Sequence, residues 1–366
     1  MVIIRSNGAL MADPSVCPNT PRQAGESWRA TAPVRICDVG GWTDTWFAGR
    51  GVVSNIAVGP GATVVVTRLP ESECGSWLLV KQQNSNENQR IRIGDLSAAA
   101  HPLLHAAIVG ADPGFPALIE VGAQVPAGAG MGTSASVTVA LLAALYAAKS
   151  DVRAGDPAAL ARDAHLTEIG LGWQSGVQDQ LAAAFGGIGH IVVDYPHAVH
   201  SPVVVDSQTL AEIDRRLLTV YLGSPHNSSA LHDDVIRRLE GTDSQAMLRP
   251  LRELAQQATQ SLQAGDLRAY GLILDQNTEA QARLDPRLVT EHARRLRVIG
   301  QAFGVLGMKV NGAGGTGGSV SFLGPDDPRD RIRLIAALEA EPGCAVLDVG
   351  LATTGVTVRT VSGDQP

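Results

Sequence analysis

The first part of the chain alternates short β-branched runs with glycine turns. The segment 33–38, Pro-Val-Arg-Ile-Cys-Asp, lies shortly before two adjacent glycines, and β-branched runs follow at 52–53 and 63–67. Runs of this kind, bounded by glycine, are typical of strands. We therefore predict strand, glycine turn and strand for this stretch, with a further short strand at 117–121.

A helical pattern takes over further along the chain. Between 137 and 148, apolar residues are separated by intervals of three, one, three, one and three positions. These intervals predict the buried stripe of an amphipathic helix. A second helix is predicted over 156–169, and the run 190–194, which follows another glycine-rich stretch, predicts a strand.

The pattern changes again at about residue 205. A run typical of a strand at 217–222 precedes a long helical sequence over 229–284, which is rich in Gln, Arg, Asp and Glu. Beyond it, the runs 307–310 and 318–323 flank a glycine-rich loop. This order of elements predicts a compact α+β second domain.

Domain boundaries follow from these changes in pattern. The polar residues 1–28, rich in Pro, Ser and Asn, predict a flexible N-terminal extension. The ranges 29–204 and 205–366 then predict an N-terminal and a C-terminal domain, and the final strand of the chain is expected at 346–349 or 355–361.

Composition narrows the class of protein. The 366 residues are 45% hydrophobic and 18% charged, which allows a substantial core and excludes disorder over most of the length. The net charge of −7 provides no basic surface for nucleic acid or an anionic membrane. The four cysteines lie far apart without a CxxC pair, and no apolar stretch approaches the roughly 20 residues of a membrane span. We expect a cytoplasmic protein without nucleic-acid or membrane partners; its oligomeric state, a homodimer included, stays open.

The strongest candidate for chemistry is the segment 126–136, which reads Pro-Ala-Gly-Ala-Gly-Met-Gly-Thr-Ser-Ala-Ser between a predicted strand and a predicted helix. Alternating glycines let the backbone approach a ligand closely, and a helix start presents free N–H groups to an anion. The segment is neither a Walker loop nor the GxGxxG fingerprint. The structural alternative is a tight turn in which a serine caps the helix.

Three segments resemble the signatures of the GHMP kinase superfamily, which includes galactokinase and the homoserine, mevalonate and phosphomevalonate kinases. The segment 126–136 is similar to the second signature, 32–44 to the N-terminal sugar-site motif, and 309–318 to the C-terminal glycine loop. The resemblance implies an α+β fold with an N-terminal domain similar to ribosomal protein S5 domain 2 and a C-terminal ferredoxin-like domain, with the active site between them.

The resemblance also implies ATP and Mg²⁺ as cofactors. It implies that ATP is held by Pro126, Gly128, Ala129, Gly130, Met131, Gly132, Thr133, Ser134 and Ala135. The Ser134 hydroxyl and the Glu168 carboxylate match the magnesium ligands of the family, a set that suits a cation keeping much of its water. For Glu168, a solvated residue at a helix end is the alternative.

Two further residues match the catalytic positions. Asp179, in the segment 173–180, resembles the active-site aspartate, whose carboxylate could accept or orient the proton of the attacking hydroxyl. Arg35 resembles the arginine beside the acceptor, where it could stabilise the transferring phosphoryl group. A turn or capping role for Asp179 and an ordinary ion pair for Arg35 are the alternatives.

The residues implied for the acceptor sugar depart from galactokinase. They are Asp44, Gly41, Trp42, Gln180, Gly314 and Gly315. Galactokinases read Gly-Glu-His-Thr-Asp where this chain reads Gly-Gly-Trp-Thr-Asp, which is closer to heptose-phosphate kinases and to fucokinase or arabinokinase domains. For Asp44, a residue that satisfies only its own turn is the alternative. Lys309 could supply charge at the C-terminal glycine loop, but a strand-edge lysine is the preferred interpretation. His226 replaces an arginine that often contacts substrate phosphate.

The function that these resemblances imply is phosphorylation of the anomeric hydroxyl of a sugar or sugar phosphate by ATP, as in the sugar 1-kinase branch. The preferred substrate is D-glycero-D-manno-heptose 7-phosphate. A fucokinase, galactokinase or arabinokinase-type specificity is the alternative within the class. A non-catalytic sugar and ATP sensor of the same fold is the alternative from another class.

Overall fold

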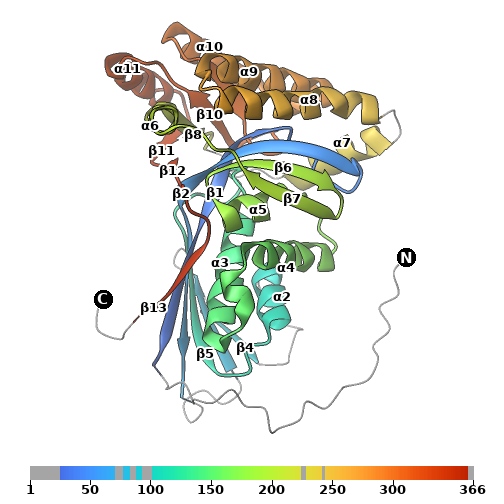
Figure 1. Ribbon diagram of the computed structural model, residues 1–366, viewed down its shortest axis with the longest axis vertical. Coiled ribbons are helices and arrows are strands. Elements are labelled where there is room, and N and C mark those ends of the chain that lie inside the picture. The colour runs from blue at the N-terminus through green and yellow to red at the C-terminus, as the bar shows by residue number, and fades with distance from the viewer. Residues whose placement is uncertain are drawn as a thin grey trace.

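The computed structural model describes residues 25–70, 77–82, 88–92, 101–223, 228–240 and 244–361. In this part of the chain two β-sheets form two layered bodies, the larger one below and the smaller one above in the view of Figure 1. Both sheets carry helices, so the predicted α+β class is confirmed. The predicted extension over 1–28 lies mostly outside the described residues, but its last two residues, Ser27 and Trp28, already belong to the first strand.

The larger sheet contains nine strands within the described residues. They are β1 (Ser27–Val39), β2 (Arg50–Arg68), β3 (Trp77–Gln82), β4 (Asn88–Arg92), β5 (Ala117–Ala123), β6 (Ile188–Asp194), β7 (His197–Pro202), β12 (Gly350–Leu351) and β13 (Thr357–Val361). The main path runs β13-β1-β2-β5-β3-β4, while β6 and β12 also pair with β2, and β7 pairs with β6. The long strand β2 therefore organises the sheet.

The two short runs predicted at 52–53 and 63–67 are parts of this one strand. Antiparallel pairing with β1 extends from Ser27 opposite Thr67 to Val39 opposite Ser54, with two shifts of register on the way. Gly61 allows the chains to stay close, because a Cβ there would overlap the carbonyl oxygen of Ala32. Gly61 thus serves close strand packing within one continuous strand.

Four helices pack on one side of the larger sheet (Figure 1). They are α2 (Pro102–Ala111), α3 (Thr133–Lys149), α4 (Pro157–Gly170) and α5 (Gln178–Phe185). The predicted helices at 137–148 and 156–169 correspond to α3 and α4, but α3 is buried on nearly all sides instead of along one stripe. It is enclosed because β1 and β2 contact it from one side and α2, α4 and α5 from the other.

The smaller sheet belongs to the C-terminal half. Its strands are β8 (Leu217–Tyr221), β9 (Gly307–Val310), β10 (Ser319–Leu323) and β11 (Ala345–Leu347), in the antiparallel order β11-β8-β10-β9. Helices lie between β8 and β9 and between β10 and β11. If the strands of this domain are numbered 1 to 4 along the chain, their order in the sheet is 4-1-3-2 and their connection is βαββαβ. This is the ferredoxin-like arrangement that the family resemblance implies.

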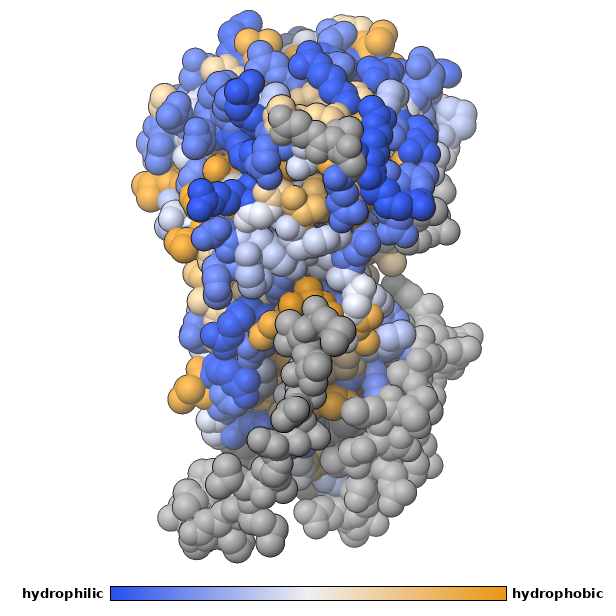
Figure 2. Space-filling view, turned by 90° about the vertical axis from the view of Figure 1, so that its right-hand side faces the viewer, coloured by the Kyte–Doolittle hydropathy of each residue, from blue (hydrophilic) through white to orange (hydrophobic). Residues whose placement is uncertain are grey.

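The face of the C-terminal half that Figure 2 shows is mainly hydrophilic. Among the described residues this half contains six helices. They are α6 (Ser207–Arg216), α7 (Ser228–Glu240), α8 (Ser244–Gln263), α9 (Leu267–Leu284), α10 (Glu291–Ala302) and α11 (Pro328–Glu339). The predicted helical sequence over 229–284 is thus three helices, α7 to α9. Within the described residues, no helix is long and apolar enough to cross a membrane.

The end of the chain returns to the larger sheet. Both alternatives for the final strand are realised, since β11 joins the smaller sheet and β13 pairs antiparallel with β1. In Figure 1, β13 runs down beside the N-terminal strand. The predicted division at 204/205 separates β7 from α6, but the last strands of the C-terminal segment contribute to the N-terminal sheet.

Ser136 connects α3 to this sheet, and its loss should destabilise the fold. Its buried Oγ donates a hydrogen bond to the carbonyl oxygen of Ala32 (2.8 Å) and accepts one from the N–H of Ala62 (3.1 Å). Ser136→Ala leaves both backbone groups unpaired, so we expect the free energy of unfolding in urea to fall by about 2 kcal/mol. Ser207→Ala, on the exposed first turn of α6, is the control and should change it by less than about 0.5 kcal/mol. Equal effects of the two variants would contradict this role of Ser136.

Candidate active site

The glycine loop between β5 and α3 forms an open helix start. Gly128, Gly130 and Gly132 have φ angles of 75°, 70° and 73°, a left-handed conformation that side chains rarely adopt. Gly132 is the N-cap of α3, and no side chain caps the first turn. The N–H groups of that turn therefore face outward with the positive end of a 17-residue helix behind them, which is the arrangement that holds phosphate.

A cavity of about 450 Å³ lies beside this helix start. Its lining includes Pro126, Thr133 and Ser134 of the loop, together with apolar side chains of α2, β5 and the following turn. The hydroxyl-bearing residue Ser134 is exposed. Ala129 and Met131 have fully buried side chains, so a ligand at this loop would meet them through their backbone.

The second glycine loop, 311–318, packs against the first. A Cβ at Gly130 would lie 3.0 Å from the carbonyl oxygen of Asn311, and the Oγ of Ser319 donates a 2.6 Å hydrogen bond to the carbonyl oxygen of Ala129. The C-terminal domain thereby fixes the shape of the N-terminal loop. Gly314 and Gly315 point elsewhere: the N–H of Gly315 donates to the carbonyl oxygen of Leu288, and a Cβ at Gly314 would overlap that same oxygen.

Arg35 and Asp179 form an ion pair at the junction of the two domains. The Nε of Arg35 donates to Oδ1 of Asp179 at 2.8 Å, and its Nη1 donates to the carbonyl oxygen of Gly130. Asp179 lies in the first turn of α5, and a Cβ at Gly132 would be 3.0 Å from its Oδ2. Burial tends to lower the pKa of Arg35, but the carboxylates of Asp179, Asp38 and Asp44 outweigh burial and raise it above its ordinary value.

A smaller cavity of about 190 Å³ opens beside this ion pair. Its lining residues are Arg35, Asp38, Trp42, Asp44, Thr45, Gln174, Ser175, Gly176, Gln178, Asp179, His232, Gly312 and Ala313. The cavity therefore brings together Arg35, Asp179, Trp42 and Asp44 of the predicted site. From the C-terminal loop it includes Gly312 and Ala313, where the sequence suggested Gly314 and Gly315.

Asp44 is buried and anchored to the start of α5. Its Oδ2 accepts hydrogen bonds from the N–H groups of Val177 and Gln178, both at 3.1 Å. Burial and, next, the nearby charge of Asp179 raise the pKa of Asp44 to about 6. The residue is thus both a wall of the cavity and a clamp on the segment that carries Asp179.

Trp42 forms another wall of the small cavity. It has a left-handed backbone conformation, with φ of 77°, and its ring lies 4.7 Å from that of His232. The buried indole Nε1 has no hydrogen-bond partner in the described structure. An unpaired buried N–H is costly, so this group is suited to a polar ligand.

Sequence reasoning missed Asp38 and Gln178, which also line the small cavity. The signal for Asp38 is its position, because it interrupts a run of buried apolar residues at the end of β1. Gln178 directly precedes Asp179 and starts α5, a helix that the sequence pattern did not predict. The apolar stretch of α5 is too short to show a helical period.

Glu168 is buried and held by two polar side chains. Its Oε2 accepts hydrogen bonds from the hydroxyl of Ser175 and from Nε2 of Gln180, the latter at 2.7 Å. Gln180, suggested for the sugar, therefore contacts Glu168 and is absent from the lining of the small cavity. Burial, with a further contribution from Asp179, raises the pKa of Glu168 to about 7.

These surroundings of Glu168 suit a divalent cation. Among the described residues, no arginine or lysine forms an ion pair with the buried carboxylate, and the second carboxylate, Asp179, lies near enough to disfavour its charge. A carboxylate oriented by amide and hydroxyl donors is typical of a metal ligand. Glu168 and the exposed hydroxyl of Ser134 thus fit Mg²⁺ chemically. His226, the substitution noted at 221–229, lies outside the described residues.

Comparison with known proteins agrees with this fold. Residues 96–187 match the GHMP kinases N-terminal domain. Lactococcus lactis galactokinase, solved with galactose, superposes with a TM-score of 0.69 at 16% identity, covering 90% of this chain and 95% of that chain. The chain therefore contains a GHMP kinase N-terminal domain and has the GHMP kinase fold.

Two curated relatives belong to the sugar-kinase side of the superfamily. The bifunctional fucokinase/GDP-fucose pyrophosphorylase of Arabidopsis thaliana is 25% identical over 312 residues, which is 79% of this chain and 29% of that protein. The D-glycero-alpha-D-manno-heptose 7-phosphate kinase of Campylobacter jejuni is 22% identical over 223 residues, which is 60% of this chain and 64% of that protein. The match thus spans less than two thirds of either relative's length.

The raised pKa of Asp44 predicts a specific pH dependence of stability. Because the native carboxyl titrates near pH 6 and an ordinary aspartate near 3.8, the native state binds more protons between these values, and stability falls as pH rises through them. Asp44→Asn removes this effect. In urea unfolding between pH 4 and 7, the free energy of unfolding of the variant should rise relative to that of the natural chain by about 2 kcal/mol as pH rises. Parallel pH profiles for the two proteins would rule out a raised pKa.

Proposed function

We propose that this protein is an ATP-dependent sugar kinase that phosphorylates the anomeric hydroxyl of its substrate. One observation carries the proposal: Asp179 lines the small cavity and also lies against Gly132, where the glycine loop begins α3. A hydroxyl bound in the cavity would therefore meet Asp179 and a phosphate held by the loop. In-line transfer needs little more than this alignment and the neutralisation of charge.

Each residue of the site has a separate role in this phosphoryl transfer. The carboxylate of Asp179 orients the sugar hydroxyl and accepts its proton as the oxygen forms its bond to the γ-phosphorus and the bond to the leaving ADP breaks. Arg35, held against Asp179 and the carbonyl oxygen of Gly130, stabilises the negative charge that develops there. The loop N–H groups bind the phosphates.

MgATP, when bound, supplies the transferable phosphoryl group and part of the charge neutralisation. We assign the cation to Ser134 and Glu168, with Gln180 and Ser175 fixing the orientation of the Glu168 carboxylate. The cavity of about 450 Å³ beside the helix start is the place for the nucleoside. Its apolar lining suits a flat, uncharged ring.

Two substrates compete within this function. The Gly-Gly-Trp-Thr-Asp motif and the Campylobacter relative support D-glycero-D-manno-heptose 7-phosphate, the substrate preferred from sequence. The charges of the small cavity support an unphosphorylated sugar of the fucokinase type, because three of its described lining residues are aspartates and Arg35 is paired with one of them. The fucokinase relative also matches more of the chain.

A coupled assay of ADP release decides between these two substrates and also tests the kinase activity itself. The panel contains fucose, galactose, arabinose and D-glycero-D-manno-heptose 7-phosphate, each with the unphosphorylated or phosphorylated counterpart. Turnover that depends on a sugar supports the kinase, and the best substrate identifies the specificity. Absence of turnover with every member, together with retained binding of sugar and ATP, would instead support a non-catalytic sensor.

Asp179→Asn should lower kcat by at least about 100-fold, the scale expected when a general base is lost. The amide still accepts a hydrogen bond from Arg35, so the ion-pair geometry is largely kept while the proton acceptor is removed. ATP affinity, measured by calorimetry, should stay close to that of the natural protein. A kcat near the natural value would remove Asp179 from the mechanism.

Gly130→Val should weaken ATP binding by at least about tenfold. A Cβ at this position lies 3.0 Å from the carbonyl oxygen of Asn311, and its φ of 70° disfavours a β-branched residue, so the loop must change shape. Gly155→Ala, where a Cβ meets nothing within 4 Å, is the matched control. Thermal melting checks that both variants fold, and unchanged ATP affinity of folded Gly130→Val would count against this loop as the phosphate site.

A further inference from the structure

Three buried polar atoms without hydrogen-bond partners occur on residues that line the small cavity. They are Oδ2 of Asp38, Nε1 of Trp42 and Oε1 of Gln178. The three residues are 0%, 5% and 6% exposed. Buried polar atoms in proteins are nearly always paired, so unpaired acceptors and an unpaired donor around one cavity indicate a ligand rich in hydroxyl groups.

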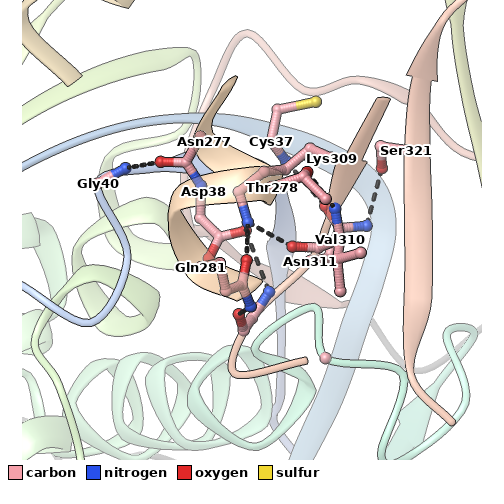
Figure 3. A network of polar contacts seen from close by, with 12 residues as sticks. Cys37, Asp38, Gly40, Asn277, Thr278, Gln281, Lys309, Val310, Asn311 and Ser321 are labelled. Atoms are coloured by element: carbon pink, nitrogen blue, oxygen red, sulfur yellow. Dashed lines mark hydrogen bonds and ion pairs between the residues drawn. The ribbon is translucent and has the colours of Figure 1, made fainter. Parts of the chain in front are cut away.

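The Oδ1 oxygen of Asp38 has the partners that hold this side chain in place. This oxygen accepts a hydrogen bond from the N–H of Gly312 at 3.1 Å and lies 3.5 Å from Nζ of Lys309 (Figure 3). Lys309 is fully buried and also donates to Oε1 of Gln281 and to the carbonyl oxygen of Val310. Lys309 lies on β9, the edge strand of the smaller sheet, as the strand-edge interpretation expects, but its side chain is buried and contacts Gln281 of α9 and Asp38 of β1. One carboxylate oxygen of Asp38 is thus paired, and the other is buried without a hydrogen-bond partner.

Gly41 lies directly against the unpaired oxygen of Asp38. A Cβ at this position would lie 2.7 Å from Oδ2 of Asp38 and 3.5 Å from Nε2 of Gln178. Any side chain at position 41 would therefore fill the volume that a ligand atom needs to reach Oδ2. The glycine and the unpaired oxygen are two independent features that point to the same place.

From these features we propose that Asp38 determines specificity for the acceptor of the proposed kinase. Its Oδ2 accepts a hydrogen bond from a hydroxyl of the bound sugar, beside a second acceptor on Gln178 and the indole donor of Trp42. Lys309 is a positioning residue, since it acts on the sugar only through Asp38. The face of the sugar that lies here carries free hydroxyls, because a phosphate group would meet the carboxylate of Asp38 and would have no hydrogen to donate.

The test is a comparison of substrates and variants. Asp38→Asn keeps an oxygen for Gly312 and Lys309 but replaces the free acceptor by an amide donor. With the best sugar of the panel, KM for the sugar should rise about 10- to 100-fold, the value of a hydrogen bond to a charged group, while KM for ATP stays unchanged. With the natural protein, one monodeoxy analogue of that sugar should have a KM higher than that of the parent sugar by a similar factor. With Asp38→Asn, removal of the same hydroxyl should raise KM little further.

Two further variants separate binding from folding. Thr278→Val removes the hydrogen bond from Thr278 to the carbonyl oxygen of Met308 in the same buried network, away from the cavity lining, and should leave discrimination among the deoxy analogues unchanged. Gly41→Ala places a methyl group beside Oδ2 without altering any charge, and should reproduce the loss of discrimination even where Asp38→Asn folds poorly.

The outcomes are distinguishable from failure of the proposed function. Absence of turnover with all sugars overturns the kinase, and equilibrium binding of the same sugars, measured by calorimetry, then still tests Asp38. The role of Asp38 is overturned if the natural protein, Asp38→Asn and Gly41→Ala all discriminate equally between the parent sugar and each deoxy analogue, in turnover or in binding. An equal loss of affinity for the sugar and for ATP in Asp38→Asn also overturns the role of Asp38, because a collapsed site would weaken the binding of both.

Discussion

Arg35 connects the parts from which the candidate site is assembled. Its backbone N–H donates to the carbonyl oxygen of Met131, its Nη1 donates to that of Gly130, and its Nε pairs with Asp179. One strand residue thus fixes the glycine loop, the start of α5 and the carboxylate between them. The guanidinium is buried, so it stays in place only because acidic groups surround it. The positions of both cavities relative to each other follow from this arrangement.

Glycine supplies the close approach that the rest of the site needs. The loops 126–132 and 311–318 touch through their backbones, which is sterically allowed because Gly130 and Gly312 have no Cβ. The N-terminal domain therefore contributes the helix start, and the C-terminal domain holds it in shape. Backbone N–H groups and a cation can bind phosphate here without a basic surface, which agrees with a net charge of −7.

The buried Asp38–Lys309 pair gives the domain junction a second role. Charged groups removed from water must be paired, and here each partner comes from a different sheet, since Asp38 ends β1 and Lys309 lies in β9. The pairing satisfies one oxygen of Asp38 and leaves the other without a partner, on a residue that lines the cavity. Acceptor recognition and the joining of the two domains would then depend on the same residue.

The sequence by itself determined the glycine loop, the order of most strands and the helices α3 and α4, because local periodicity and glycine spacing specify them. It also placed Arg35, Asp179, Asp44 and Trp42 in one site through ordered motifs. Only the tertiary structure decided that Gln180 contacts Glu168, that Gly314 and Gly315 face Leu288, and that Asp38 and Gln178 line the cavity. It alone also joined β13 to the first sheet. These are contacts between residues far apart in the chain, and the direction in which a side chain points across a domain junction leaves no local pattern in the sequence.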